Sequence, residues 1–474
     1  MAQYNPALTD PLYPGGLPPS GTATTVPGTR NWSLGSYTTG SYPASVTFYS
    51  DRLAFGGATN TPDRVDLSVS SQYNVFSPNA LLDGTVADSN ALGFGLNSNT
   101  VNAIRWMSPT DHGLLLGTSG GPWMLKGATA SQPLSPTNVD AKQAAPYGAQ
   151  KVPAVVIGRQ TLFLQTGGRH LRDAAYDFYV DGLSTKDISL LAEHLTTGGF
   201  TQMAVQQTPT QIVWLVRADG LLVSMCYDPE QKEVAWAQHP IGGNGVAQSV
   251  AVIPDPTGSR DELWLAVKRM INGAAALYVE KMSKIYEIGD AVSGNFVPGD
   301  TLFHDSGVHK TFGSPVTTVT GLTWLEGETV SVLADSATHP DVTVTSGGIT
   351  LQRSATDVSV GLPYESRART MRVEAGSADG TAQSKIKRIH KVAFRMYDTL
   401  GLFVRANSPY ASDAPVSFRT TGDDMNAPPP LFTGDKIQLW EGDYEYDGTI
   451  EFGQSEPLPS NISAIVAHVD TQDD

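Results

Sequence analysis

The chain has 474 residues, of which 40% are hydrophobic and 16% charged, with 47 glycines and 31 prolines. Low charge together with many turn residues indicates an all-β protein and disfavours a largely helical one. The formal net charge is −16. An acidic surface repels nucleic acid and anionic membranes, which disfavours tight non-specific DNA binding. A simple gain in solubility explains the acidity equally well.

Cys226 is the single cysteine, so neither an intrachain disulfide nor a thiolate metal site can form. It stands in an apolar run, which predicts a buried core thiol rather than a nucleophile. No basic segment followed by an apolar core opens the chain, so no signal peptide is expected. No apolar run approaches the length that spans a bilayer. We therefore expect a protein made in a reducing cytosol.

Residues 1–45 are rich in Pro, Gly, Ser and Thr and show no hydrophobic periodicity. This composition predicts an extended arm rather than a domain.

The next segment, residues 46–285, repeats one pattern of strand, glycine turn and strand. Its clearest copy, residues 211–239, has turns at Asp219-Gly220 and Asp228-Pro229. A looser copy begins at Arg52. Such a period, with several strands per repeat, is typical of β-propeller blades, and five candidate blades are present. A β-sandwich with long hairpins is the alternative. Successive spacings of 48, 51 and 50 residues separate four equivalent positions: Leu115, Phe163, Trp214 and Trp264.

One helix is expected within this repeat region, over residues 186–194. Ser184 and Asp187 have the spacing of a capping box, with Asp in place of the usual Glu. Ile188, Leu191 and Leu195 then fall on one face of the helix.

Two further β regions are expected. Residues 286–363 read as a small β-module, in which residues 322–325 are expected to form a strand. Residues 364–474 contain longer strands of alternating hydrophobicity. They predict an antiparallel sheet or β-sandwich domain.

Sequence signatures of catalysis are not found: there is no P-loop, no Gly-x-Ser-x-Gly elbow and no His-Glu-x-x-His helix. A glycosidase would use two facing carboxylates, but no pair stands out among 47 acidic residues. We therefore predict no catalytic residues, no metal site and no cofactor.

Two weaker patterns suggest metals. His304 and His309 are close in sequence, but their spacing favours an ordinary polar loop over a ligand pair. Four aspartates lack the ligand order of a known calcium loop, and a solvated rim is the better interpretation: Asp173, Asp177, Asp181 and Asp187.

A run of basic residues stands out in the otherwise acidic chain. It can be a solvated strand face, a contact for an acidic neighbouring subunit, or a nucleic-acid contact. The acidic balance elsewhere supports the subunit contact. Reversing the charge of residues 385, 387 and 388 is expected to weaken assembly and leave the monomer folded. The candidate inter-subunit residues are Arg367, Arg369, Arg372, Lys385, Lys387, Arg388, Lys391 and Arg395.

Several phrases resemble the tail nozzle proteins of short-tailed bacteriophages, also called tail tubular protein B. The resemblance covers roughly residues 40–405. Two of its phrases are Asp51-Arg-Leu-Ala-Phe-Gly-Gly57 and Leu116-Gly-Thr-Ser-Gly-Gly-Pro-Trp123. The most specific are Asp219-Gly-Leu-Leu222, Tyr227-Asp-Pro-Glu-Gln231 and Val234-Ala-Trp236.

This resemblance implies a virion structural protein of the phage tail, made in the host cytoplasm, without enzymatic activity, cofactor or membrane insertion. Such subunits form a six-fold ring with an outer β-propeller. The ring lies below the portal and adaptor and above fibre, spike or tail-tip proteins, and genomic DNA passes through it without specific binding. One departure is that members of this family are often longer, with another β-rich portion ahead of the Arg52 phrase.

The alternative function is a carbohydrate-binding β-propeller, a lectin-like receptor-binding protein of the virion; a propeller hydrolase is a third option. Sugar binding would use aromatic platforms in each blade. The candidate tryptophans stand in apolar strands, which favours core packing for most of them: Trp106, Trp123, Trp214, Trp236 and Trp264.

Overall fold

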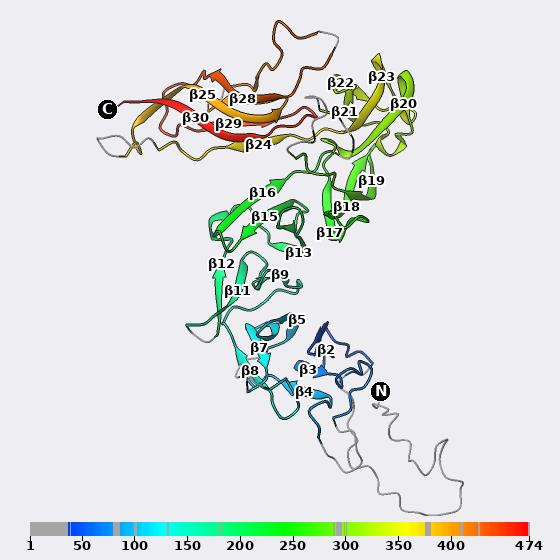
Figure 1. Ribbon diagram of the computed structural model, residues 1–474, viewed down its shortest axis with the longest axis vertical. Coiled ribbons are helices and arrows are strands. Elements are labelled where there is room, and N and C mark those ends of the chain that lie inside the picture. Colours follow the sequence, from blue (N-terminus) through cyan, green and yellow to red (C-terminus); the bar gives the residue numbers. More distant parts are fainter. Residues whose placement is uncertain are drawn as a thin grey trace, which may run out of the picture. The chain divides into compact units, whose positions relative to one another are not determined.

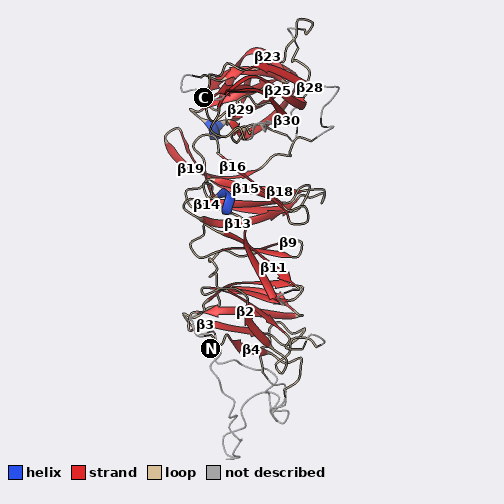
Figure 2. Ribbon diagram, turned by 90° about the vertical axis from the view of Figure 1, so that its left-hand side faces the viewer, coloured by secondary structure: helices blue, strands red, loops and turns tan. Residues whose placement is uncertain are grey.

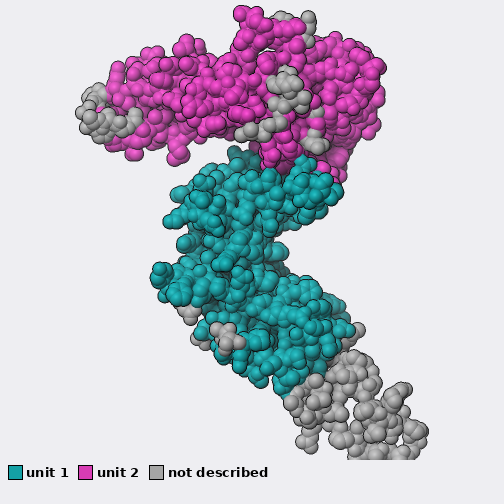
Figure 3. Space-filling model, viewed as in Figure 1, with its two compact units in different colours: residues 1–239, 249–263 teal, residues 240–248, 264–474 magenta. Residues whose placement is uncertain are grey.

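The computed structural model describes residues 37, 39–78, 86–98, 102–129, 132–179, 182–287, 290, 296–297, 299, 301–374, 381–407, 411–424 and 427–472. Within these ranges the regular elements are antiparallel strands and two 3₁₀ turns, so the predicted all-β class is confirmed. No helix in these ranges is long and apolar enough to cross a membrane. The chain forms two compact units, residues 1–239 with 249–263 and residues 240–248 with 264–474 (Figure 3).

Five consecutive meanders, in which chain neighbours pair, occupy the repeat region (Figure 1). The first contains β1 (Ser45–Tyr49), β2 (Arg52–Ala58), β3 (Thr61–Leu67) and β4 (Leu92–Gly95). The second contains β5 (Ile104–Thr110), β6 (Gly113–Thr118), β7 (Pro122–Lys126) and β8 (Asp140–Gln143). The third contains β9 (Val155–Ile157), β10 (Gln160–Leu164), β11 (Leu171–Asp177) and β12 (Gly182–Asp187).

The fourth meander contains β13 (Phe200–Gln206), β14 (Ile212–Arg217), β15 (Leu222–Asp228) and β16 (Glu233–His239). The fifth has three strands, β17 (Val246–Pro254), β18 (Asp261–Ile271) and β19 (Ala274–Lys281), and its residues are divided between the two units. The positions used to align the repeat all lie on the second strand of a sheet: Leu115 on β6, Phe163 on β10, Trp214 on β14 and Trp264 on β18. The predicted strand–turn–strand repeat is therefore confirmed.

Side-chain alternation along the inner strands makes the sheets of the first unit pack face to face (Figure 2). On β6, Leu114 and Leu116 enter a core shared with the first sheet, whereas Leu115 enters a core shared with the third. On β10, Phe163 faces the second sheet, and its neighbours Leu162 and Leu164 face the fourth. Successive side chains of a strand point to opposite faces, so each inner strand contributes to two cores. Such stacking occurs in propeller blades and in open arrays, and the closed ring stays a prediction.

The helix predicted over residues 186–194 is wrong. Lys186 and Asp187 end β12, where they pair with Asp173 and Arg172 of β11. Only a 3₁₀ turn, Leu190–Ala192, follows. Leu191, expected on the buried face of that helix, is 96% exposed, so no continuous apolar face packs to stabilise a longer helix.

The prediction of a buried Cys226 is also wrong, because the thiol is exposed. Met225 and Tyr227 of β15 point into the core between the third and fourth sheets. Alternation places Cys226 on the opposite face near the end of the strand, where it is not covered.

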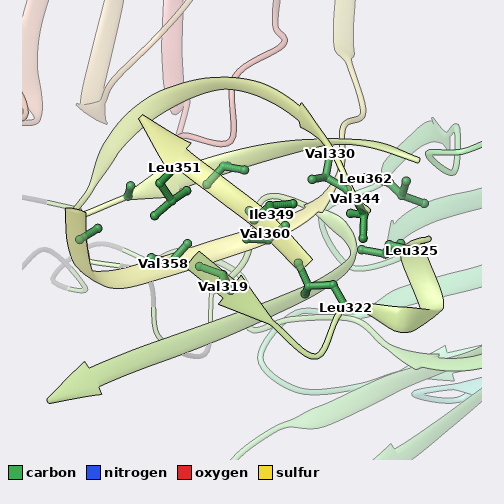
Figure 4. Close-up of a cluster of buried hydrophobic side chains, with 13 residues drawn as sticks. Val319, Leu322, Leu325, Val330, Val344, Ile349, Leu351, Val358, Val360 and Leu362 are labelled. Atoms are coloured by element: carbon green, nitrogen blue, oxygen red, sulfur yellow. The ribbon is translucent and has the colours of Figure 1, made fainter. Parts of the chain in front are cut away.

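The small β-module contains β20 (Asp305–Thr320), β21 (Thr329–Ala334), β22 (Ala337–Thr343) and β23 (Gly348–Leu362), in the sheet order β20-β23-β21-β22. Figure 4 shows its apolar core. The strand predicted at residues 322–325 is wrong, because Thr323–Leu325 form a 3₁₀ turn. Leu322 and Leu325 are both fully buried in this core. Three residues per turn bring them to one side, whereas a strand would turn them to opposite faces.

The C-terminal region is a sandwich of two antiparallel sheets. One has the order β24 (Ser366–Arg369), β29 (Ile450–Gln454), β26 (Phe403–Ala406) and β27 (Ala414–Pro415). The other has the order β28 (Phe432–Leu439), β25 (Ile386–Thr399) and β30 (Ile462–Gln472). Val392 and Phe394 of β25 share one core with Val404 of β26 and Ile450 of β29, so the sheets pack face to face. We call these two sheets the sandwich.

The predicted segments correspond to these sheets as follows. Residues 286–363 contain the module sheet, and residues 364–474 contain both sheets of the sandwich. Of the predicted arm, residues 1–36 and 38 lie outside the described residues. The two compact units divide the chain after residue 239, within β17 and within β18.

Candidate interaction surface

The basic run predicted as an inter-subunit patch lies within the sandwich but is divided between its two sheets. Arg367 and Arg369 are on β24, the edge of the first sheet. The residues from 387 onward are on β25, the central strand of the second sheet. Arg372 and Lys385 are in the connecting segment, parts of which lie outside the described residues. One sequence run thus supplies two separate surfaces.

Arg367 is surrounded by acidic side chains of its own sheet. Its guanidinium contacts the carboxylate of Glu365, lies 2.9 Å from Asp413 and 2.5 Å from Glu451, and stacks over the Phe403 ring at 4.9 Å. Hydrogen bonds to Glu365 and then Glu451 raise the pKa of the Arg367 guanidinium further above its usual value. This cation is therefore neutralised within the sheet.

Other members of the run also have partners in the sandwich. The Arg372 Nε atom lies 2.8 Å from Asp447, and Arg395 donates to both oxygens of Asp435 at 2.8 and 3.0 Å. The Arg388 guanidinium lies over the Tyr444 ring at 5.4 Å. Arg369 donates to the hydroxyl of Thr449 and the amide oxygen of Asn407.

Lys387 is buried, with 2% of its surface exposed. Its Nζ donates to the carbonyl of Tyr446 at 2.8 Å, and its backbone exchanges two hydrogen bonds with Glu445. A glutamate here would place a carboxylate against that carbonyl without a donor. Charge reversal at Lys387 is therefore incompatible with the expectation of an unaltered fold. Lys385 and Lys391 are half-buried.

A surface that the sequence did not reveal lies on the outer face of sheet β28-β25-β30. Ile437 and Leu439 are 62% and 74% exposed, and Val466 is 48% exposed. Ile437 and Val466 pair with Ala393 of β25 from either side, and Leu439 pairs with Lys391, so the three form one patch. We call these three residues the outer row. Neighbouring exposed aliphatic residues mark contact surfaces in soluble proteins.

The residues that carry the phage resemblance have structural roles. Arg52 is buried, and its guanidinium donates to the carbonyls of Ser68, Asp88 and Asn90 at 2.6–2.7 Å. A Cβ on Gly117 would come within 2.0 Å of the Trp106 ring, so only glycine fits there. These residues fix the loops and packing of the first two sheets.

The same holds in the third and fourth sheets. The Tyr227 hydroxyl donates to Asp173 of β11 at 2.7 Å and so joins these two sheets. The Trp236 ring stacks on Phe200. In the hairpin turn, hydrogen bonds from Arg217 lower the pKa of Asp219 to about 2.

Two of the residues considered as metal ligands, His309 and Asp187, pair with other side chains. His309 contacts Asp357 at 2.9 Å, Asp187 contacts His170 at 2.8 Å, and Asp181 lies outside the described residues. His304 is 7% exposed, and burial lowers its pKa to about 4. Among the residues that the structure describes, no group of three or more His, Cys, Asp or Glu side chains could hold a metal.

The tryptophans considered as sugar platforms are largely inside the sheets. Trp106, Trp123 and Trp214 are 2%, 5% and 3% exposed, and Trp236 and Trp264 are half-buried. A ring buried in a core has no free face on which a sugar could stack. The core-packing interpretation holds for the first three.

Comparisons with known proteins identify no family. No family model matches the chain, and no curated protein matches it. Among solved structures, the exo-β-1,3-galactanase of Phanerochaete chrysosporium is 8% identical, with a TM-score of 0.26 over 90% of this chain and 95% of that one. The N-terminal domain of Nup159 is 9% identical, with a TM-score of 0.25 over 86% and 88%. A Lactobacillus plantarum protein is 12% identical, with a TM-score of 0.30 over 67% and 87%. Scores this low carry no argument about fold or function.

Proposed function

We propose that this chain is a structural subunit of a bacteriophage tail nozzle, without enzymatic activity, that assembles into a ring around the path of the ejected DNA. The proposal begins from the phrases shared with nozzle proteins. Their best-defined residues, including Arg52, Gly117 and Tyr227, support sheets and loops. Shared residues of this kind fit a common architecture. In this proposal the five meanders are blades of a β-propeller.

The observation that carries the proposal is the outer row of the sandwich. A ring of identical subunits is built from a surface on one copy that binds a different surface on the next. Ile437 and Leu439 expose large aliphatic side chains on the outer face of the sheet, where the residues are normally polar. Burying them against a neighbour removes that apolar surface from water, which favours association.

Charge supports the second part of the proposal, the conduit. The net charge is −16. In the basic run Arg367, Arg372 and Arg395 are paired with carboxylates of the sandwich. DNA binding is favoured when free Lys and Arg side chains displace the counterions condensed on the phosphates. A surface whose basic side chains are already paired with carboxylates therefore binds phosphates weakly. Weak binding lets DNA pass.

The experiment that tests this function is gold labelling of the protein in intact particles of its source, imaged by electron microscopy. Label at the tail below the head vertex, together with rings of the purified chain, is the expected result. Protein that is absent from particles and free in the lysate would overturn the proposal. In that case screening against glycans becomes the next step.

A further inference from the structure

A groove of about 460 Å³ opens along one side of the sandwich. It runs between β24, the edge strand of one sheet, and β30, the edge strand of the other. Its lining comes from these two strands and from the strand and loops beside them, and includes Arg367, Leu402, Phe452, Ile462, Ser463 and Ile465. The groove therefore exposes the core of the sandwich where its two sheets part.

The edge of β30 is long and open. Among the described strands β30 pairs only with β25, and it has 11 residues without proline. Its other side presents backbone N–H and C=O groups that can pair with an added strand, a known mode of peptide binding. A strand added there would also cover the half-buried side chains of Ile462 and Ile465.

The chemistry of the groove selects an uncharged occupant. Leu402, Phe452 and Ile465 give it an apolar floor, and Ser463 gives it a hydroxyl rim. Arg367 is the one charged residue of the lining, and carboxylates already surround it. A charged segment would lose hydration here without gaining a free partner.

The N-terminal segment of the chain has the matching composition. In residues 1–36, which lie outside the described residues, the only charged side chains are Asp10 and Arg30. Proline lacks the N–H that pairing needs. Between Pro19 and Pro27, however, residues 20–26 form an uncharged Pro-free run, Ser-Gly-Thr-Ala-Thr-Thr-Val, with four β-branched residues. β-Branched residues favour strands.

The lengths of the two segments set the geometry of an exchange between copies. A strand of seven residues spans roughly 23 Å, less than the roughly 36 Å of the 11-residue β30. Residue 26 precedes residue 37, where the described chain begins, by 11 positions, so the extended link between them spans at most about 40 Å. The ring must therefore bring residue 37 of one copy within that distance of the groove of the next.

We propose that residues 20–26 of a second copy of this chain add as a strand to the free edge of β30 and cover the groove. The inference rests on the proposed ring, because a ring places each groove next to another copy. It deepens that function by naming the surface and the segment that join adjacent subunits.

The test uses full-length chains that each carry one engineered cysteine. The exposed native thiol is first removed by Cys226→Ser. One chain then carries Ser463→Cys at the groove, the other carries Thr24→Cys, and the two are mixed and oxidised. Ser463 is exposed, so this substitution leaves the core intact. The control replaces Ser463→Cys by Ser314→Cys, because Ser314 is also an exposed serine on an edge strand, β20.

Disulfide-linked dimers several-fold in excess over the Ser314→Cys control are the expected result. Dimers no more abundant than in the control would overturn the inference. So would a doubly substituted chain, Thr24→Cys with Ser463→Cys, that closes only on itself while the mixed chains stay unlinked. Sedimentation of the same samples reports assembly separately. Rings without the cross-link would refute the strand exchange alone, whereas monomers without the cross-link would refute the ring as well.

Discussion

Replacing the outer row tests self-association directly. We predict that Ile437→Ser with Leu439→Ser weakens ring assembly and leaves the monomer folded. Burying a Leu or Ile side chain completely contributes about 1.5–3 kcal/mol. These side chains are 62% and 74% exposed, so covering what remains exposed contributes about 1–2 kcal/mol each. The double variant should therefore lose about 2–4 kcal/mol per contact, or about 30- to 700-fold in Kd.

The assay is sedimentation velocity over a range of concentrations, with circular dichroism and Tm as checks on folding. The matched control is Val297→Ser with Met371→Ser, because these side chains are 44% and 89% exposed in the same unit but lie outside the strands and form no aliphatic row on a sheet. The control should assemble like the unaltered chain. Equal weakening in both variants, or none in either, would refute the assignment of the outer row as a subunit contact.

Three further predictions concern stability. His304 has a folded pKa of about 4, below its unfolded value of about 6.5. Its contribution to the free energy of unfolding is therefore complete above pH 6.5 and is lost as the pH falls toward 4. In urea unfolding, the free energy of unfolding should fall by about 2 kcal/mol between neutral pH and pH 5. The same change of pH should lower it by less in His304→Leu. Lys387→Glu should cost about 3–5 kcal/mol in urea unfolding, whereas Arg388→Glu, at an exposed site, should change stability by less than about 0.5 kcal/mol. Gly117→Ala, which crowds the Trp106 ring, should cost about 1–3 kcal/mol and lower the Tm; an unchanged Tm would contradict the packing described.

The repeat was predictable because its signals are local. Alternating apolar residues and glycine turns specify a hairpin within about twenty residues, as at Gly220, whose φ of +86° suits glycine. Both partners of each pairing are close in sequence, so the order of the strands within each meander followed from the chain.

The errors arose where distant residues decide the outcome. Residues 186–187 pair with β11, which overrides a short helical pattern. Cys226 was expected to be buried and is exposed, whereas Lys387 was expected on the surface and is buried. The burial of each side chain depends on which face of its strand a neighbouring sheet covers. The basic run looked like a free patch because its carboxylate partners, such as Asp435 and Glu451, follow it by 40 or more positions. Single-sequence patterns do not contain those contacts.

The two-sided use of β6 and β10 has a consequence for how this chain can change length. Leu115 and Phe163 join the second sheet to the third, while their neighbours join the same sheets to those outside. Stability in such an array is a sum over adjacent layers. Losing one strand would leave two layers uncovered, but inserting a complete meander recreates the same pair of faces. Viable insertions and deletions in this region should therefore come in units of one meander, about 50 residues, as in the spacings of 48, 51 and 50.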